Sequence, residues 1–216
     1  MDGVTLQDRI NRGLGTAARA IGLVCDAFRP SGPDDPLQPT NRYLRLTAAF
    51  NAQDPRFART NAYGVAVWYG VFDAAYTRIG DYLVERLSGT AWFIAAQQAL
   101  LPALCVRTNR VVTFERAAAP KRTGTNAYGG VTQGSSTVLL TGWPASVLAA
   151  APTERSDGGL PGDVRLGSFA VLLPAWPGTV LRSGDLMSDD VGRSFAVSTA
   201  ELSELGWRLG VRQVAS

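Results

Sequence analysis

The stretch YTRIGDYLVE, residues 76–85, has a near copy in TVLRSGDLMSD, residues 179–189. The likeness extends towards the N-terminus without a gap when residues 64–81 are aligned with 168–185, and five positions are then identical. These identical pairs are Ala66 with Ala170, Val67 with Val171, Arg78 with Arg182, Gly80 with Gly184, and Asp81 with Asp185. Towards the C-terminus, two small shifts align Gly89 with Gly192, Trp92 with Phe195, Ile94 with Val197, and Val106-Arg107 with Val211-Arg212. The shared order of strand, Gly-Asp turn, strand, Gly turn and strand predicts that one β unit occurs twice.

The Gly-Asp turn has a physical reason to recur. Glycine supplies the positive φ that a tight entry turn needs, and aspartate can accept hydrogen bonds from nearby backbone amides. The arginine two residues before each glycine is placed for a local ion pair with that aspartate. We therefore interpret Arg78 with Asp81, and Arg182 with Asp185, as structural pairs. Each unit should be an antiparallel sheet of four to five short strands that curls into a barrel or docks on a partner.

The rest of the chain suggests four regions. Apolar residues at spacings of three and four predict an amphipathic helix over residues 4–28, which a proline-rich linker ends. The expected fold is mainly β with an N-terminal α-helix and two similar small antiparallel β-barrel or sandwich modules. The predicted regions are an N-terminal helix and extended linker (1–50), a first β module (51–117), a long loop, strand and linker (118–165), and a second β module (166–216).

Composition excludes several kinds of site. The chain contains no histidine, so it lacks the usual general base near neutral pH and the commonest metal ligand. Lys121 is its single lysine. Cys25 and Cys105 lie in apolar stretches and are expected to be small buried residues in a reducing compartment. The polar N-terminus predicts no signal peptide, and the sequence predicts no membrane contact.

Two further kinds of motif have simpler explanations than a cofactor site or a catalytic site. Residues 13–18, GLGTAA, fit a dinucleotide-binding pattern but follow helix-like sequence where a strand is required. Acidic pairs that could serve a glycosidase are expected to be solvated turn acids. These pairs are Asp34 with Asp35, Asp189 with Asp190, and Glu201 with Glu204. The sequence therefore predicts no catalytic, cofactor-binding or metal-binding residues.

One basic cluster and five tryptophans remain. Residues 107–122 carry Arg107, Arg110, Arg116, Lys121 and Arg122 against a single acid, Glu115. This segment is either a solvated strand end and loop or a surface for phosphates or an acidic partner. The tryptophans, in strand-like contexts, are expected in the core or at a subunit interface, with a sugar-binding platform as the alternative. They are Trp68, Trp92, Trp143, Trp176 and Trp207.

The repeated pattern resembles that of small β-barrel head-closure, neck and tail-associated structural proteins of tailed bacteriophages. The residues that carry the resemblance are Gly80, Asp81, Gly89, Trp92 or Phe93, Gly184, Asp185, Gly192, Phe195, Val197 and Trp207. It covers about half of the chain, in two pieces, and the N-terminal helix and the second module depart from the simple stopper plan.

The resemblance implies a non-enzymatic protein that forms part of a ring in the neck or tail of a virion, assembled in the bacterial cytoplasm. Its partners would be other copies of itself and neighbouring virion proteins such as the portal or adaptor and tail or baseplate components. Non-specific DNA contact would use residues 107–122, the N-terminal helix would be a docking arm, and the glycine-rich loop 118–137 would order on contact. The alternatives are an assembly or binding module of a non-virion contractile device and a carboxylate-based glycan-acting enzyme.

Overall fold

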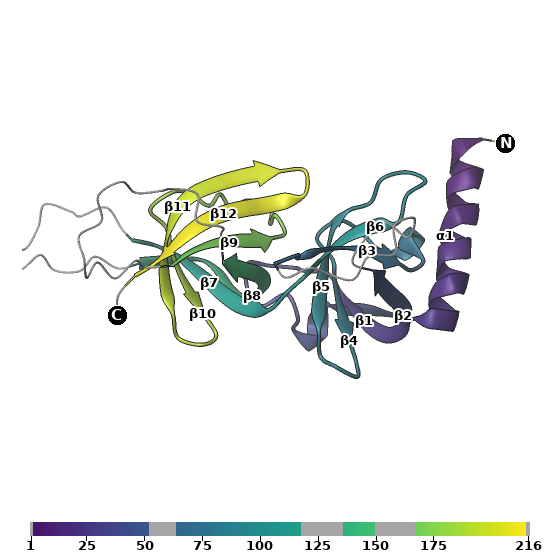
Figure 1. The fold of residues 1–216 in the computed structure, drawn as a ribbon, viewed down its shortest axis with the longest axis horizontal. Helices are drawn as coiled ribbons and strands as arrows, with labels where there is room; N and C mark the ends of the chain where they lie inside the picture. Colours follow the sequence, from purple (N-terminus) through teal and green to yellow (C-terminus); the bar gives the residue numbers. More distant parts are fainter. Residues whose placement is uncertain (1, 52–63, 118–135, 150–166, 215–216) are drawn as a thin grey trace, which may run out of the picture.

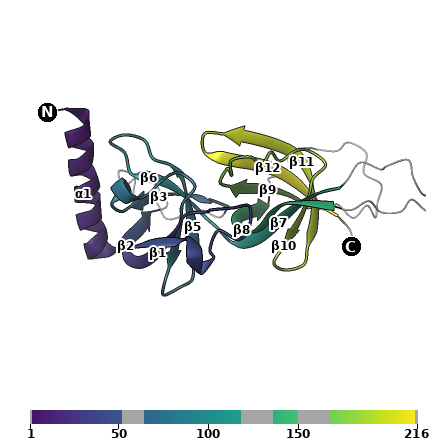
Figure 2. The ribbon, with the colours of Figure 1, turned by 180° about the vertical axis from the view of Figure 1, so that it is seen from behind.

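The computed structural model describes residues 2–51, 64–117, 136–149 and 167–214. Three parts follow one another along the long axis of the molecule (Figure 1): a helix at one end, a first β-barrel beside it, and a second β-barrel beyond the first. The view from behind shows the same order (Figure 2). The predicted glycine-rich loop lies almost wholly outside the described residues.

Helix α1 spans Gly3–Ile21 and begins at Asp2, whose side chain accepts a hydrogen bond from the Thr5 amide. The predicted helix over 4–28 was too long. The chain turns at Gly22, where a Cβ would lie 2.5 Å from the Ala48 carbonyl oxygen. Beyond this glycine the apolar, β-prone residues pair with a neighbouring strand instead of continuing the helix.

The first barrel has six antiparallel strands that close in the order β1-β2-β3-β6-β5-β4. Every neighbouring pair in this ring is joined by a strand ladder, including β1 with β4. Its strands are β1 Leu23–Phe28, β2 Arg42–Asn51, β3 Val67–Val71, β4 Tyr82–Glu85, β5 Ala91–Ala96 and β6 Ala103–Arg107.

The second barrel repeats this plan and closes in the order β10-β11-β12-β9-β8-β7. In both barrels the fourth strand returns to pair with the first, which is the Greek-key arrangement. Its strands are β7 Arg110–Ala117, β8 Ser136–Ala149, β9 Ser168–Leu173, β10 Leu186–Asp189, β11 Ser194–Ser203 and β12 Gly206–Gln213. The expected fold class is confirmed: two similar antiparallel β-barrels and one N-terminal helix.

The repeated unit is larger than the sequence comparison indicated. It has six strands, not four to five, because residues 23–51 supply β1 and β2 while residues 110–149 supply β7 and β8. Strand β1 lies in the predicted helix and β2 in the predicted linker, while the strand predicted within residues 118–165 is β8. Strand β8 and residues 110–117, which were predicted in the first module, belong to the second barrel. Local pattern could not assign them, because their pairing partners lie far along the chain.

Strand pairing also corrects part of the alignment. The ladders make Gly70 equivalent to Val171, since both are buried and each pairs with the matching position of β2 or β8. They likewise make Cys105 equivalent to Val211. The identities Ala66-Val67 with Ala170-Val171 are thus out of register, because the connection between β9 and β10 is longer than that between β3 and β4. At the Gly-Asp turns and at Trp92 with Phe195 the alignment is correct.

The two barrels share part of one hydrophobic core. All six residues of β5 are buried, because one face points into the first barrel and the other packs against the second. Trp92 and Ile94 belong to the interior of the first barrel. Phe93 and Ala95 join the cluster that fills the second barrel, together with Tyr82.

Candidate functional site

The buried acid of each Gly-Asp turn holds its barrel together. Asp81 is 2% exposed and accepts hydrogen bonds from Arg29 Nε at 2.9 Å and Arg29 Nη2 at 2.8 Å. It also accepts one from the Arg78 amide at 2.8 Å and one from the Tyr43 hydroxyl at 2.6 Å. Gly80 has a φ of 89°, as predicted for this turn. We call this set the first clamp.

Asp185 is held in the same way in the second barrel, which we call the second clamp. It is 2% exposed and accepts from Arg116 Nε at 2.7 Å, from Arg116 Nη2 at 2.9 Å and from the Arg182 amide at 2.7 Å. Arg116 also donates to the Val180 carbonyl oxygen at 2.7 Å. Gly184 has a φ of 93°.

The predicted partner of each aspartate was therefore wrong in one respect. Arg78 and Arg182 contribute their backbone amides, whereas the ion pairs are made by Arg29 and Arg116. The hydrogen bonds to Asp81 and Asp185 raise the pKa of Arg29 and Arg116. Arg29 directly follows β1, and Arg116 lies near the C-terminal end of β7, the equivalent strand. A repeat traced further towards the N-terminus would therefore have found both arginines.

The joint between the barrels is two residues long. Thr108 and Asn109 connect β6 to β7, and the Asn109 side chain pairs with Val147 by accepting from its amide at 2.7 Å and donating to its carbonyl oxygen at 2.9 Å. Tyr82, wholly buried, donates its hydroxyl to the Pro144 carbonyl oxygen at 2.8 Å. These contacts fix the first barrel on β8 of the second.

A loop of the first barrel also reaches β8. Trp143, in the core of the second barrel, donates from Nε1 to the Pro33 carbonyl oxygen at 2.7 Å. The Thr141 amide donates to the same oxygen at 3.0 Å. The ring of Trp143 meets that of Tyr82 edge to face at 6.2 Å, so hydrogen bonds and aromatic packing support one joint.

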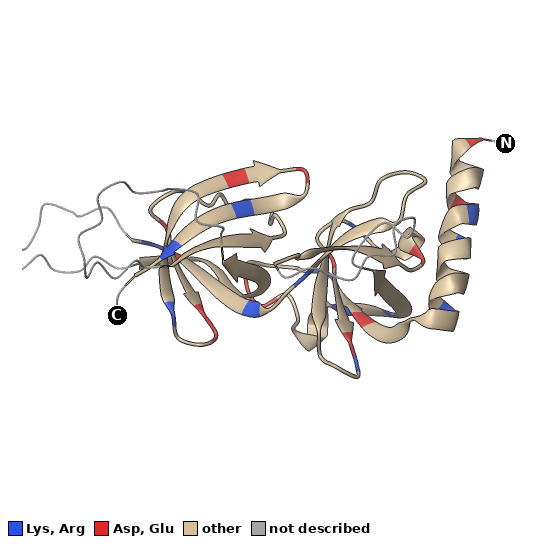
Figure 3. Ribbon diagram, viewed as in Figure 1, with Lys and Arg blue, Asp and Glu red and all other residues tan. Residues whose placement is uncertain are grey.

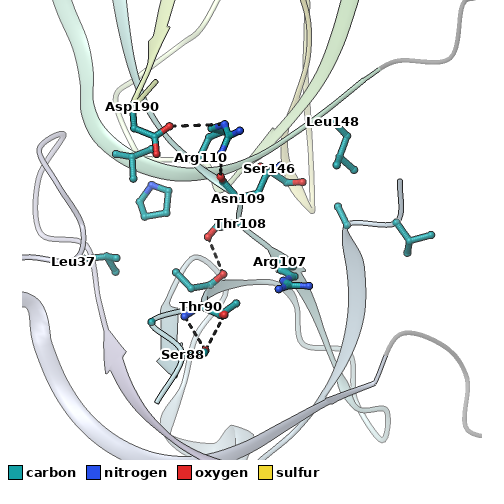
Figure 4. Close-up of a pocket in the computed structure, with 16 residues that line it drawn as sticks. Leu37, Ser88, Thr90, Arg107, Thr108, Asn109, Arg110, Ser146, Leu148 and Asp190 are labelled. Carbon is teal, nitrogen blue, oxygen red and sulfur yellow. Dashed lines mark hydrogen bonds and ion pairs between the residues drawn. The ribbon is translucent and has the colours of Figure 1, made fainter. Parts of the chain in front are cut away.

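A cleft of about 540 Å³ lies beside this joint, and its size is typical of a small-ligand site. Figure 4 shows Arg110, Asp190 and Ser146 on the side of the second barrel, and Ser88, Thr90 and Arg107 on the side of the first. The apolar part of its lining includes Leu37, Val65, Ala66, Ala91, Val111, Pro144 and Leu148.

The acidic pairs that could serve a glycosidase do not converge in this cleft. Asp189 is bound by Arg193 at 2.7 Å, while Asp190 has Arg110 Nε at 4.0 Å. Asp35 accepts from the Leu37 amide in its own loop. Glu201 and Glu204 are exposed on the hairpin of β11 and β12.

The remaining sequence candidates are separated in space. Arg107 and Arg110 line the cleft, Arg116 belongs to the second clamp, and Lys121 and Arg122 lie outside the described residues. Basic and acidic residues are interspersed over both barrels (Figure 3). The GLGTAA motif lies within α1, so it does not form the strand-to-helix turn of a dinucleotide site.

The aromatic and cysteine residues mostly lie in the cores. Trp92, Trp143 and Trp207 are buried, while Trp68 and Trp176 pack on the two cores from partly exposed positions. Cys25 and Cys105 are buried and free. Burial raises the pKa of the Cys25 thiol from 9.0 to about 12 and raises that of Cys105 as well. Neither thiol is a reactive thiolate near neutral pH.

Within the described ranges, no cluster of three or more acidic or cysteine residues could hold a metal ion. No helix in the described part of the chain is both long and apolar enough to cross a bilayer. No family model matches this chain, and neither a search of curated proteins nor a search of solved structures found a match.

Proposed function

We propose that the chain is a non-enzymatic structural protein of a bacteriophage virion that forms part of a ring in the neck or tail. The observation that carries this proposal is that the buried carboxylates form ion pairs inside the barrels. In the described residues, the buried carboxylates are Asp81, Asp185 and Asp189, and each is held by an arginine within its own barrel. These carboxylates therefore serve to stabilise the fold of the barrels.

The joint between the barrels also favours a structural role, as a rigid subunit of an assembly. A continuous core and a two-residue connection give two barrels with a fixed relative position. A subunit that joins two layers of an assembly needs this kind of rigidity, because flexible subunits lose entropy on ordering.

The end of the molecule that carries α1 offers an apolar surface for contacts between subunits. The helix docks on its own barrel, and Gln7 accepts from the Leu100 amide at 2.7 Å. Around this docked helix the large exposed apolar residues are Val4, Leu6, Ile21, Leu23, Val24, Leu100 and Leu101. Surfaces of this kind commonly mark protein interfaces.

Size-exclusion chromatography with light scattering tests the proposal. We expect a ring-sized oligomer, formed alone or on addition of the neighbouring virion proteins. Leu6→Glu combined with Ile21→Glu should dissociate it, and Thr5→Glu, on the charged side of α1, should leave it intact. A chain that stays monomeric with those partners, and that hydrolyses glycans until Asp190→Asn abolishes the activity, would instead support a carboxylate enzyme.

A further inference from the structure

The cleft between the barrels contains hydrogen-bond donors without partners. Arg110 Nε is buried and donates no hydrogen bond. The nearest carboxylate oxygen, Asp190 Oδ1, is 4.0 Å away, which is too far for a hydrogen bond. Another nitrogen of the same guanidinium, Nη1, is used, because it donates to the Asn109 carbonyl oxygen at 2.9 Å.

Two further groups line the same cleft. The Arg107 guanidinium lies 5.8 Å from the ring centroid of Trp92 and makes no hydrogen bond or ion pair within the described ranges, although the Arg107 amide donates to the Ala66 carbonyl oxygen. Ser146 is 2% exposed, and its hydroxyl has no hydrogen-bond partner among the residues that the structure describes. Of these groups, Arg110 Nε is the buried donor without a partner, whereas Arg107 is exposed to solvent. Leaving a buried donor unpaired is costly, so such a group commonly marks a place where a ligand or water binds.

Charge and shape define the ligand class. Two arginines and one aspartate line the cleft, so one positive charge is in excess. Leu37 and Val65 supply apolar surface from the first barrel, and Pro144 and Leu148 supply it from the second. We propose that this cleft binds the carboxylate of a monoanionic ligand with an apolar body, between Arg107 on one barrel and Arg110 and Ser146 on the other.

A carboxylate suits these donors better than a phosphate. A carboxylate accepts hydrogen bonds from guanidinium and hydroxyl groups, which are the donors that Arg110 and Ser146 present on one wall of the cleft and Arg107 on the other (Figure 4). It also neutralises the single excess charge, whereas a dianionic phosphate would leave negative charge beside Asp190. The carboxylate can belong to a free acid or to the end of a peptide, and both present the same chemistry to the cleft.

Amide NMR titration of the full chain tests the proposal. The probes are 4-methylpentanoate, N-acetyl-leucyl-leucine with a free carboxylate, the same dipeptide as its amide, and inorganic phosphate. We expect the carboxylates, at millimolar concentration, to shift the amides of Asn109, Ser146 and Asp190. Binding of the dipeptide but not of the free acid would assign the carboxylate to a peptide terminus, and the reverse would assign it to a small acid.

Matched variants separate the cleft from general charge effects. Arg107→Gln and Ser146→Ala should each weaken carboxylate binding, the former by about tenfold. Arg12→Gln, which removes an exposed arginine of α1, should leave binding unchanged. The proposal is overturned if neither carboxylate shifts the cleft amides, if the amide or phosphate binds as tightly, or if Arg12→Gln weakens binding as much as Arg107→Gln.

Discussion

The two clamps perform the same task with different surroundings. In the first barrel, Asp81 accepts from Tyr43 as well as from Arg29, and the Arg29 guanidinium lies 4.4 Å from the Tyr43 ring centroid. In the second barrel the place corresponding to Tyr43 is taken by Leu139, and Arg116 donates instead to a backbone carbonyl oxygen. The comparison indicates that the bidentate Arg-Asp pair is the essential part of the unit, while its third partner can vary.

The interiors of the two barrels also differ in the side chains that occupy equivalent positions. Cys25 and Ala27 of the first barrel correspond to Val112 and Phe114 of the second, because each pair faces the matching residues of the fourth strand. The smaller residues of the first barrel leave room that Trp92, stacked on Phe50 at 4.1 Å, helps to fill. One strand plan therefore accepts two different packing solutions, as expected when total volume is kept.

The largest expected effect comes from breaking either clamp. Asp81→Asn and Asp185→Asn each leave a partly buried arginine without its ion partner, which should lower the free energy of unfolding by about 3–5 kcal/mol. The loss should be greater for Asp81→Asn, since it also disturbs the Tyr43 hydroxyl. Urea denaturation measures both values, and a loss below about 1 kcal/mol in either variant would show that its clamp is not essential.

Alkaline pH should destabilise the protein through buried groups of the first barrel. Cys25, Cys105 and Tyr82 all lie in this barrel and have raised pKa values, chiefly because burial disfavours their charged forms. Their stabilising contribution is complete below the unfolded pKa and falls as pH rises through the folded pKa. For Cys25 this window runs from pH 9.0 to about 12.

Denaturation at a series of pH values checks this expectation. Cys25→Ala should remove a slope of about 1.4 kcal/mol per pH unit within that window. Because the two barrels share part of one core, hydrogen exchange at high pH should rise together in β1, β6, β7 and β12. A Cys25→Ala variant that keeps the full slope would contradict the assignment of this slope to Cys25.

Tyr82→Phe should weaken the joint by about 1–3 kcal/mol, because the buried Pro144 carbonyl oxygen loses its donor. The variant keeps the aromatic contact with Trp143, so the change reports the hydrogen bond alone. Thermal unfolding measures the loss. No change in stability would mean that this hydrogen bond does not contribute to holding the barrels together.

The smallest effect is expected from Tyr43→Phe, at about 1 kcal/mol, because Arg29 and the Arg78 amide remain bound to Asp81. Tyr76→Phe, which alters an exposed tyrosine of the same barrel, is the matched control and should not change stability. A loss as large as that of Asp81→Asn would make Tyr43 an equal member of the first clamp.

Local chemistry made part of this fold predictable. The glycine and aspartate of each turn, Gly80-Asp81 and Gly184-Asp185, act within three residues, so their roles could be inferred from sequence. The partners Arg29 and Arg116 are distant in the chain, so no local pattern points to them, and only a repeat traced across the whole barrel would. The cleft was not predicted either, because Ser146 and Arg107 come together only when the barrels pack.

The boundary between α1 and β1 was missed for a related reason. Leu23, Val24 and Phe28 continue the apolar spacing of the helix, so periodicity alone extends it. The strand forms because these residues pair with β2 and β4, a tertiary effect that outweighs local preference. Gly22, which permits the close approach to Ala48, was the available signal.

The central claim is that two copies of one barrel are joined into a single body by a shared core. Urea unfolding followed by hydrogen exchange at β1 and β12 tests it most directly. The account predicts one transition with the same midpoint in both strands, and a shift of that common midpoint in Asp185→Asn. Two separate midpoints, with β1 unaffected by Asp185→Asn, would contradict it.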